Sequence, residues 1–198
     1  MSKKEEAVEY SPGISIRTDL ESYGDYIKLQ TTKMRERPNE MRRAEKGHRN
    51  KFRIHMSLLK EEADGTRLLC VGARHGTEAT VAESMGFDPV AMDLLPGREA
   101  RETVQADFHF LPFKADSFDC LYTNSMDHSL RPDLMNEEMK RVLRPGGTGL
   151  VLGHYDTGPY GVLRWRKTKP LVEMLRRWWG RVEEKRDQII IVRDETKT

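Results

Sequence analysis

The feature that most constrains this chain is a short apolar stretch that runs into a glycine turn. Residues 68–71 (LLCV) predict a buried strand, and Gly72 and Gly76 follow in the sequence GARHG. A helical stretch over residues 77–85 comes directly after this turn. Glycine lets a backbone approach a ligand closely, and the first turn of a helix presents free N–H groups. The pattern therefore predicts a nucleotide-containing cofactor at the first strand of an α/β sheet.

Strand-like and helix-like segments alternate after this point. The expected strands cover residues 67–72, 89–93, 104–107, 118–123, 148–154 and 188–193. The expected helices cover residues 77–85, 97–102, 133–142 and 170–182. This alternation predicts a doubly wound, mostly parallel sheet of the Rossmann-like α/β class. We expect residues 63–198 to form that domain. Residues 1–62 should form an N-terminal helical extension or lid, with a loose terminus over 1–18 and helices over 19–36 and 40–62.

The composition fits a globular chain with one sizeable core. The 198 residues are 37% hydrophobic and 33% charged, and no apolar run approaches the length of about 18 that a membrane span needs. The start, MSKKEEAVEY, does not resemble a secretory signal, so we expect a cytoplasmic protein. Cys70 and Cys120 fall inside expected strands, where we interpret them as reduced core residues. The sequence offers no metal-site pattern.

Charge is distributed unevenly along the chain. Lys and Arg outnumber Asp and Glu in residues 1–60 (14 against 9) and in residues 161–198 (11 against 6), whereas residues 61–160 are acidic (9 against 17). Basic ends of this kind suit an anionic partner such as nucleic acid. Solvated helix faces that balance the acidic centre also explain them, and we favour this interpretation.

Two aspartates narrow the choice of cofactor. Asp93 ends the second expected strand, 21 positions after Gly72, where a carboxylate can accept both ribose hydroxyls of an adenosine. Asp107 ends the third, where it can accept an amino N–H of adenine while an adjacent apolar side chain covers the ring. Either aspartate could instead open the turn that follows its strand.

Taken in order, these pieces resemble the class I S-adenosylmethionine-dependent methyltransferases. The matching segments are LLCVGARHG, AMDLLPG, QADFHFLPF, SFDCLYTNS and LRPGG, which lie between Leu68 and Tyr155. The resemblance implies a sheet of order 3-2-1-4-5 with S-adenosylmethionine over the carboxyl ends of its first strands. The family normally has two more strands after the fifth. Only residues 188–193 read clearly as a strand there, so we expect a shortened C-terminal edge.

Carried over by position, the resemblance assigns contacts to S-adenosylmethionine. It places Gly72, Ala73 and Gly76 beside the methionine part and the ribose, Asp93 on the ribose hydroxyls, and Leu94 on adenine. It places Asp107 and Phe108 at the adenine edge, and Asn124 and Ser125 near the transferred methyl group. Two positions depart from the family pattern. Cys70 stands where an acidic residue is usual, and Arg74 where glycine is usual.

A hydroxyl acceptor would need a general base, and three residues beyond the fourth and fifth strands are candidates. They are His128, Asp127 and His154. The N-terminal helices, with Tyr23, Tyr26, Arg42, Arg43 and His48, and the loop 155–169 are candidate walls for the acceptor.

We expect the acceptor to be a small hydroxylated or sugar-like metabolite. Alternatives are methylation of RNA or protein, a non-catalytic interaction protein with the methyltransferase fold, and a nicotinamide-dependent oxidoreductase. The sequence does not fix the oligomeric state.

Overall fold

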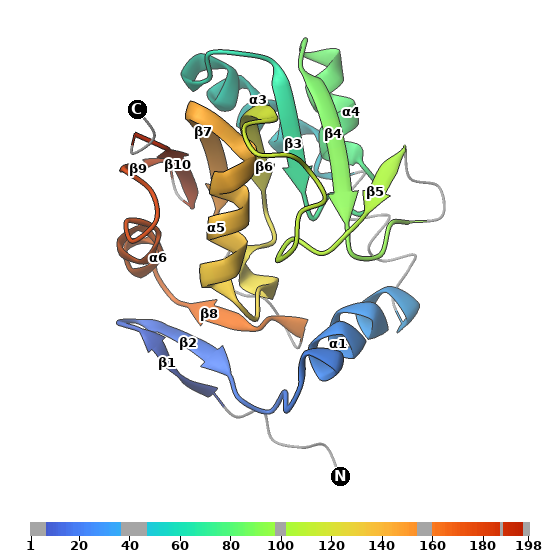
Figure 1. Cartoon of the computed structure of the whole chain (residues 1–198), viewed down its shortest axis with the longest axis vertical. Helices are drawn as coiled ribbons and strands as arrows, with labels where there is room; N and C mark the ends of the chain where they lie inside the picture. The colour runs from blue at the N-terminus through green and yellow to red at the C-terminus, as the bar shows by residue number, and fades with distance from the viewer. Residues whose placement is uncertain (1–6, 37–46, 98–101, 154–159, 187, 196–198) are drawn as a thin grey trace.

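The central element of the fold is a seven-stranded sheet (Figure 1). The computed structural model describes residues 7–36, 47–97, 102–153, 160–186 and 188–195. In order across the sheet, the strands are β5 (Thr103–Gln105), β4 (Asp88–Asp93), β3 (Arg67–Val71), β6 (Phe118–Thr123), β7 (Leu143–Leu152), β10 (Ile189–Arg193) and β9 (Arg181–Arg186). The first five pair in parallel, and β10 is antiparallel to both of its neighbours. The prediction of a doubly wound, mostly parallel sheet of order 3-2-1-4-5 is confirmed.

Helices cover both faces of this sheet. One face packs against α3 (Arg49–Glu62) and α4 (Thr77–Ser84), the other against α5 (Pro132–Val142) and α6 (Thr168–Leu175). Successive residues of β3 alternate between the two cores, as a strand buried on both faces requires. Cys70 and Cys120 lie on neighbouring strands, buried and unbridged, as expected. No helix in the described ranges is long and apolar enough to cross a membrane.

The expectation of a loose N-terminus over residues 1–18 is wrong for its described part. Strands β1 (Ala7–Ser11) and β2 (Ile14–Arg17) form a hairpin, and β8 (Leu163–Trp165) pairs with β2 to complete a second, three-stranded sheet. Gly13 makes the turn with a φ of +74°, which glycine adopts readily. Ile14 and Trp165, a register pair, are both buried. The polar composition of this segment concealed the few side chains that anchor it.

The C-terminal edge also differs from the prediction. α6 ends at Leu175 rather than 182, and residues 181–186 form the edge strand β9 beyond β10. The edge is therefore complete, with two strands after β7, and not shortened. The segment RVEEKR buries only Val182, so its hydrophobic pattern is too weak to predict a strand. Charged side chains are typical of edge strands, because they discourage pairing with other chains.

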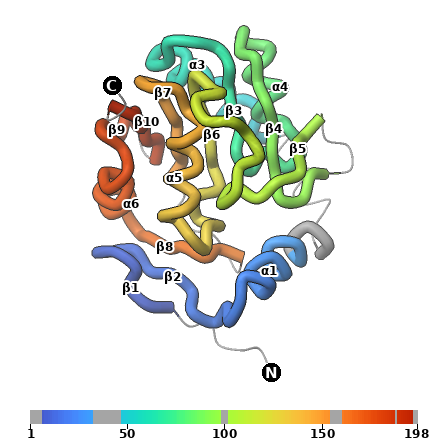
Figure 2. The backbone as a smooth tube through the Cα atoms, viewed as in Figure 1, coloured from blue at the N-terminus to red at the C-terminus, as the bar shows by residue number. Residues whose placement is uncertain are grey.

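The carboxyl ends of the parallel strands meet the N-terminal elements. Figure 1 shows β3 and β4 pointing toward α1 (Tyr23–Glu36) and β8, and Figure 2 shows the small sheet and α1 side by side along that end of the central sheet. Ligands of doubly wound folds bind at this end, near the point where strand order reverses. The fold therefore places the glycine turn after β3 at the end of the sheet that faces α1.

Candidate functional site

A pocket lies at the carboxyl ends of β3, β4 and β6. Its walls come from the ends of these strands and the loops after them, from the loop after β5 and from α1. Its lining residues are Tyr26, Gln30, Gly72, Arg74, Asp93, Leu94, Leu95, Phe108, Ser125 and His128. Six residues predicted for the site thus line one pocket, namely Gly72, Asp93, Leu94, Phe108, Ser125 and His128. Ala73, Gly76, Asp107, Asn124 and Asp127 are not part of this lining, and His154 lies outside the described residues.

The glycine turn brings bare backbone to the pocket. Gly72 has a φ of +77°, and its N–H donates to the carbonyl of Met92 at 3.0 Å. A Cβ atom at position 72 would overlap Ser125 Oγ. Gly76, with a φ of +68°, is the N-cap of α4. The turn therefore needs glycine at both positions, and the missing side chain at position 72 lets Ser125 pack directly against the backbone beside the pocket.

Asp93 is held rigidly at the end of β4. Its Oδ2 accepts the N–H of Arg74 at 3.0 Å, and its Oδ1 accepts the N–H of Leu95 at 2.8 Å. A carboxylate has about four acceptor sites, so two bonds leave capacity on both oxygens. Because Asp93 also lines the pocket, this remaining capacity suits two adjacent ribose hydroxyls. The free acceptor sites of this carboxylate therefore fit an adenosine-containing cofactor.

Arg74, one of the two departures from the family pattern, also lines this pocket. Its φ is +32°, a region where side chains are rare and where the usual glycine would be relaxed. Its backbone closes the loop by donating to Asp93 and by accepting the N–H of Gly97 at 2.9 Å. Arg74 therefore closes the loop through its backbone and is part of the pocket lining.

Asp107 is tied to α1 and to its own loop. Its Oδ1 accepts the backbone N–H of His109 at 2.8 Å and lies 2.7 Å from His109 Nδ1, and its Oδ2 accepts the hydroxyl of Tyr23. The imidazole is fully buried, and the N–H of Arg131 donates to its Nε2 at 3.3 Å. Nδ1 therefore carries the proton that Asp107 accepts. Burial would raise the pKa of Asp107, but the bonds from His109 and Tyr23 hold that pKa below its usual range.

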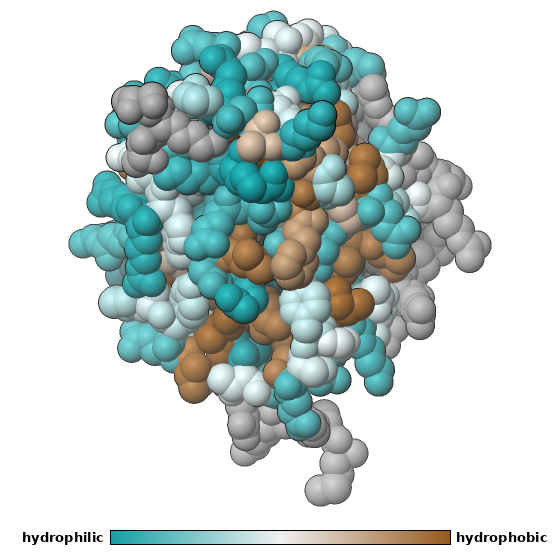
Figure 3. Space-filling view, in the orientation of Figure 1, coloured by the Kyte–Doolittle hydropathy of each residue, from teal (hydrophilic) through white to brown (hydrophobic). Residues whose placement is uncertain are grey.

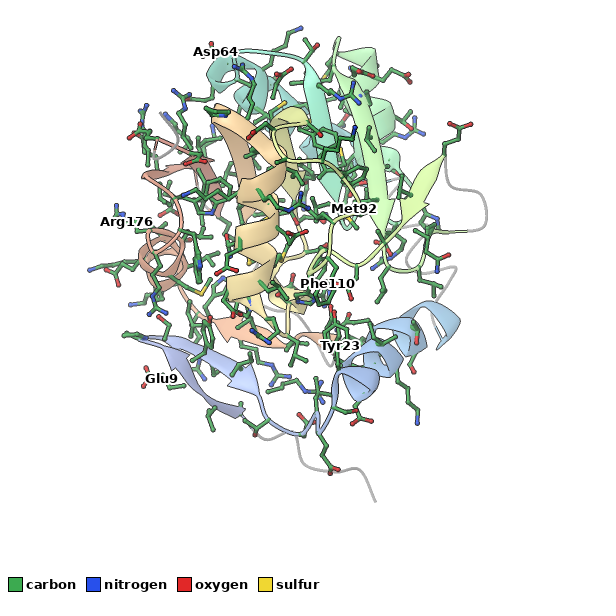
Figure 4. All side chains as sticks on the ribbon, viewed as in Figure 1. Glu9, Tyr23, Asp64, Met92, Phe110 and Arg176 are labelled. Atoms are coloured by element: carbon green, nitrogen blue, oxygen red, sulfur yellow. The ribbon has the colours of Figure 1, made fainter. Side chains whose placement is uncertain are left out.

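These contacts make Tyr23 a bridge between α1 and the sheet. Figure 4 shows Tyr23 beside Phe110, and the ring centroids lie 6.2 Å apart. Phe110 is 61% exposed. The space-filling view shows apolar side chains gathered in the middle and lower part of the face in view (Figure 3). The bond to Asp107 thus secures the start of α1 beside an exposed aromatic side chain.

We expect Tyr23→Phe to destabilise the protein by about 1–3 kcal/mol at pH 7, because it deletes a hydrogen bond to a carboxylate. A carboxyl whose folded pKa is lowered stabilises the fold above its unfolded pKa, and that contribution disappears as pH falls through the folded pKa. The cost of the substitution should therefore shrink as pH falls from 7 toward about 2. Urea unfolding across this range measures it, and an equal cost at both ends would contradict the assigned bond.

His128 lines the same pocket as Asp93. It ends a short 3₁₀ helix, Met126–His128, and its Nδ1 lies 3.2 Å from the carbonyl oxygen of Tyr160. A carbonyl only accepts, so Nδ1 carries a proton and Nε2 is the acceptor nitrogen. The buried Asp127 places its Oδ2 3.4 Å from that Nε2. The pair can thus take up a proton and stabilise the resulting imidazolium.

Sequence reasoning missed one wall of the pocket. Gln30 donates its side-chain N–H to the same Tyr160 carbonyl at 3.1 Å, so α1 and His128 share one anchor. Tyr26, predicted only as part of a lid, is buried with its ring centroid 5.4 Å from that of His109. The spacing of four places both side chains on one helix face, which was the signal available. Two other lid candidates, Arg42 and Arg43, lie outside the described residues, and His48 is exposed.

Comparisons with known proteins agree with this geometry. Residues 69–151 match the family described as "Methyltransferase domain". An uncharacterized methyltransferase of Mycobacterium avium is 35% identical over 112 residues, which cover 51% of this chain and 44% of that protein. A demethylmenaquinone methyltransferase of Clavibacter sepedonicus is 31% identical over 112 residues, covering 50% and 45%. The chain thus spans less than half the length of these curated relatives.

The same fold occurs in solved structures. The 1,6-didemethyltoxoflavin-N1-methyltransferase of Burkholderia thailandensis, solved with its substrate and S-adenosylhomocysteine, superposes with a TM-score of 0.73 at 15% identity. The superposition covers 96% of this chain and 99% of that one. At this identity the likeness establishes the fold alone. The match over residues 69–151 identifies a methyltransferase domain in this chain, and the strand order and this superposition agree with the class I methyltransferase fold.

Proposed function

We propose that this chain transfers the methyl group of S-adenosylmethionine to a small-molecule acceptor. The observation that carries the proposal is the single pocket that joins the Gly72 turn, the Asp93 carboxylate and the His128 imidazole. The first two suit an adenosine-containing cofactor, and the third suits proton removal from an acceptor. The match of residues 69–151 to a methyltransferase domain supports the same chemistry.

The residues divide into a cofactor half and an acceptor half. In the cofactor half, Asp93 would hold the ribose hydroxyls, and Leu94 and Phe108 would face the adenine ring with Asp107 behind. The methyl group of S-adenosylmethionine is already activated, because the neutral thioether is a good leaving group. The chain's own task is then alignment, which can supply on the order of 7–11 kcal/mol of the barrier. Tyr26 and Gln30 on α1 would exclude water from this alignment.

The acceptor half favours a small uncharged molecule with a hydroxyl group, such as a phenol or a sugar. Apart from Arg74 and Asp93, the described side chains of the pocket wall are uncharged. A phosphorylated or polymeric acceptor would call for a basic wall there. His128 Nε2, oriented by the bond from Nδ1 to Tyr160, would take the hydroxyl proton, and Asp127 would stabilise the charged ring.

Titration calorimetry with three ligands tests the proposal. We expect micromolar binding of S-adenosylmethionine and S-adenosylhomocysteine, and none of NAD at the same concentration. Asp93 lies where a nicotinamide enzyme also binds ribose. NAD therefore serves as the control for binding that any adenine dinucleotide could achieve in this fold. Absence of binding by the first two ligands would exclude the methyltransferase activity. Tighter binding of NAD than of either would point to the oxidoreductase alternative.

A further inference from the structure

A buried carboxylate, that of Glu78, follows the glycine turn and is not part of the pocket lining. Glu78 is the second residue of α4, which begins immediately after the N-cap Gly76, and only 3% of its surface is exposed. A helix N-terminus stabilises negative charge, so the position favours the ionised form. Burial is the main cause of the raised pKa of Tyr122, and the nearby Glu78 carboxylate adds to it. The fold therefore keeps a negative charge in the wall behind Gly72.

Two side chains connect this carboxylate to the pocket. The amide nitrogen Nδ2 of Asn124 donates to Glu78 Oε1 at 3.5 Å. The amide oxygen Oδ1 of Asn124 accepts the hydroxyl of Ser125 at 3.2 Å. Ser125 in turn lines the pocket, directly beside Gly72. A chain of hydrogen bonds thus runs from Glu78 through Asn124 to the pocket surface.

The direction of these bonds has a chemical consequence. A carboxylate only accepts, so it fixes which end of the Asn124 amide faces Glu78. The other end, the oxygen, then takes the Ser125 proton. The Ser125 oxygen consequently presents its lone pairs to the pocket and suits a ligand that donates N–H. S-adenosylmethionine has such a donor in the ammonium group of its methionine part, the part expected beside Gly72.

We propose that Glu78 is a positioning residue for the ammonium group of S-adenosylmethionine, acting through Asn124 and Ser125. The inference rests on the proposed function, because it takes S-adenosylmethionine as the ligand.

The test compares two ligands that share adenosine and a thioether but differ in the amino-acid part. S-adenosylhomocysteine carries the ammonium group, and 5′-methylthioadenosine does not. We expect Glu78→Gln to weaken binding of S-adenosylhomocysteine about tenfold, or roughly 1.4 kcal/mol, while methylthioadenosine changes by less than about twofold. Glutamine can donate as well as accept, so it no longer fixes the Asn124 amide. Glu83→Gln, on the exposed face of the same helix, should change neither affinity.

Asn124→Ala gives an independent route should Glu78→Gln fail to fold. It breaks the same chain of bonds and should produce the same ligand-specific loss, with little further loss in the double variant. Equal weakening of both ligands, or of neither, would overturn the role of Glu78. If the wild type bound methylthioadenosine but not S-adenosylhomocysteine, the inference would fail while an adenosine site remained. Binding of neither ligand by the wild type would contradict the proposed function itself.

Discussion

Replacing Asp93 with asparagine should weaken binding of S-adenosylhomocysteine by about 10²–10⁴-fold. Two hydrogen bonds from ribose hydroxyls to a carboxylate contribute about 1.5–3 kcal/mol each, and 1.4 kcal/mol corresponds to a factor of ten. Asparagine keeps the size of the side chain but offers one accepting oxygen, which the backbone N–H of Arg74 or Leu95 already requires. Titration calorimetry with wild-type and variant protein measures the difference.

A matched control variant distinguishes the loss of a contact to the ligand from the loss of a bond that stabilises a loop. Asp119 also accepts a backbone N–H, that of Arg67 at 2.9 Å, and forms an ion pair with Arg144 at 2.7 Å, but it is not part of the pocket wall. Asp119→Asn should lower stability to an extent similar to Asp93→Asn and leave the affinity unchanged. Affinity within about threefold of wild type in Asp93→Asn would remove Asp93 from the binding site.

The half of the site that lies at strand ends could be predicted from sequence because topology fixes it. Gly72 and Asp93 follow two strands that pair in parallel, and Ser125 follows β6 on the other side of β3. Parallel strands end at one edge of the sheet, so residues just after them must meet there. Local patterns of apolar runs, glycines and aspartates were enough to identify each strand end.

The half supplied by α1 depends on contacts that no local pattern encodes. Tyr23 and Asp107 are 84 residues apart, and their bond forms only because the β1–β2 hairpin delivers α1 to the edge of the sheet. Gln30 depends likewise on a carbonyl in the distant segment around Tyr160. Tertiary packing of this kind decides side-chain position after secondary structure is set, so sequence reasoning could identify a lid but not its contacts.

The edge strand β9 was missed for a related reason. Apolar and polar residues alternate only weakly along β9. Lys185 and Glu183 form an ion pair at 2.9 Å on its surface. An edge strand with one open side needs few apolar residues, since its hydrogen bonds to β10 supply the register. A strand of this type can be identified only when its partner strand is known, whereas the apolar β10 could be predicted from its own sequence.

The second large effect is expected at the proposed general base, His128. With the acceptor that gives the highest turnover among a panel of small phenols and sugars, His128→Asn should lower kcat by about 10²–10⁴-fold, the usual contribution of a general base. Asparagine retains a donor near the position of Nδ1 and can keep the bond to Tyr160, but it has no nitrogen able to take a proton. Affinity for S-adenosylhomocysteine should change little, because the ribose and amino-acid contacts are intact.

The pH dependence of kcat distinguishes a base from a residue that only shapes the wall. A histidine base must be neutral to act, so kcat should fall on the acid side in the wild type, and this fall should vanish in His128→Asn. Asp127→Asn should retain the acid limb and move it to lower pH, since the carboxylate 3.4 Å from Nε2 no longer favours the imidazolium. An unchanged acid limb in His128→Asn would assign proton removal to another group. In that case the ring of His128 would only pack against the acceptor.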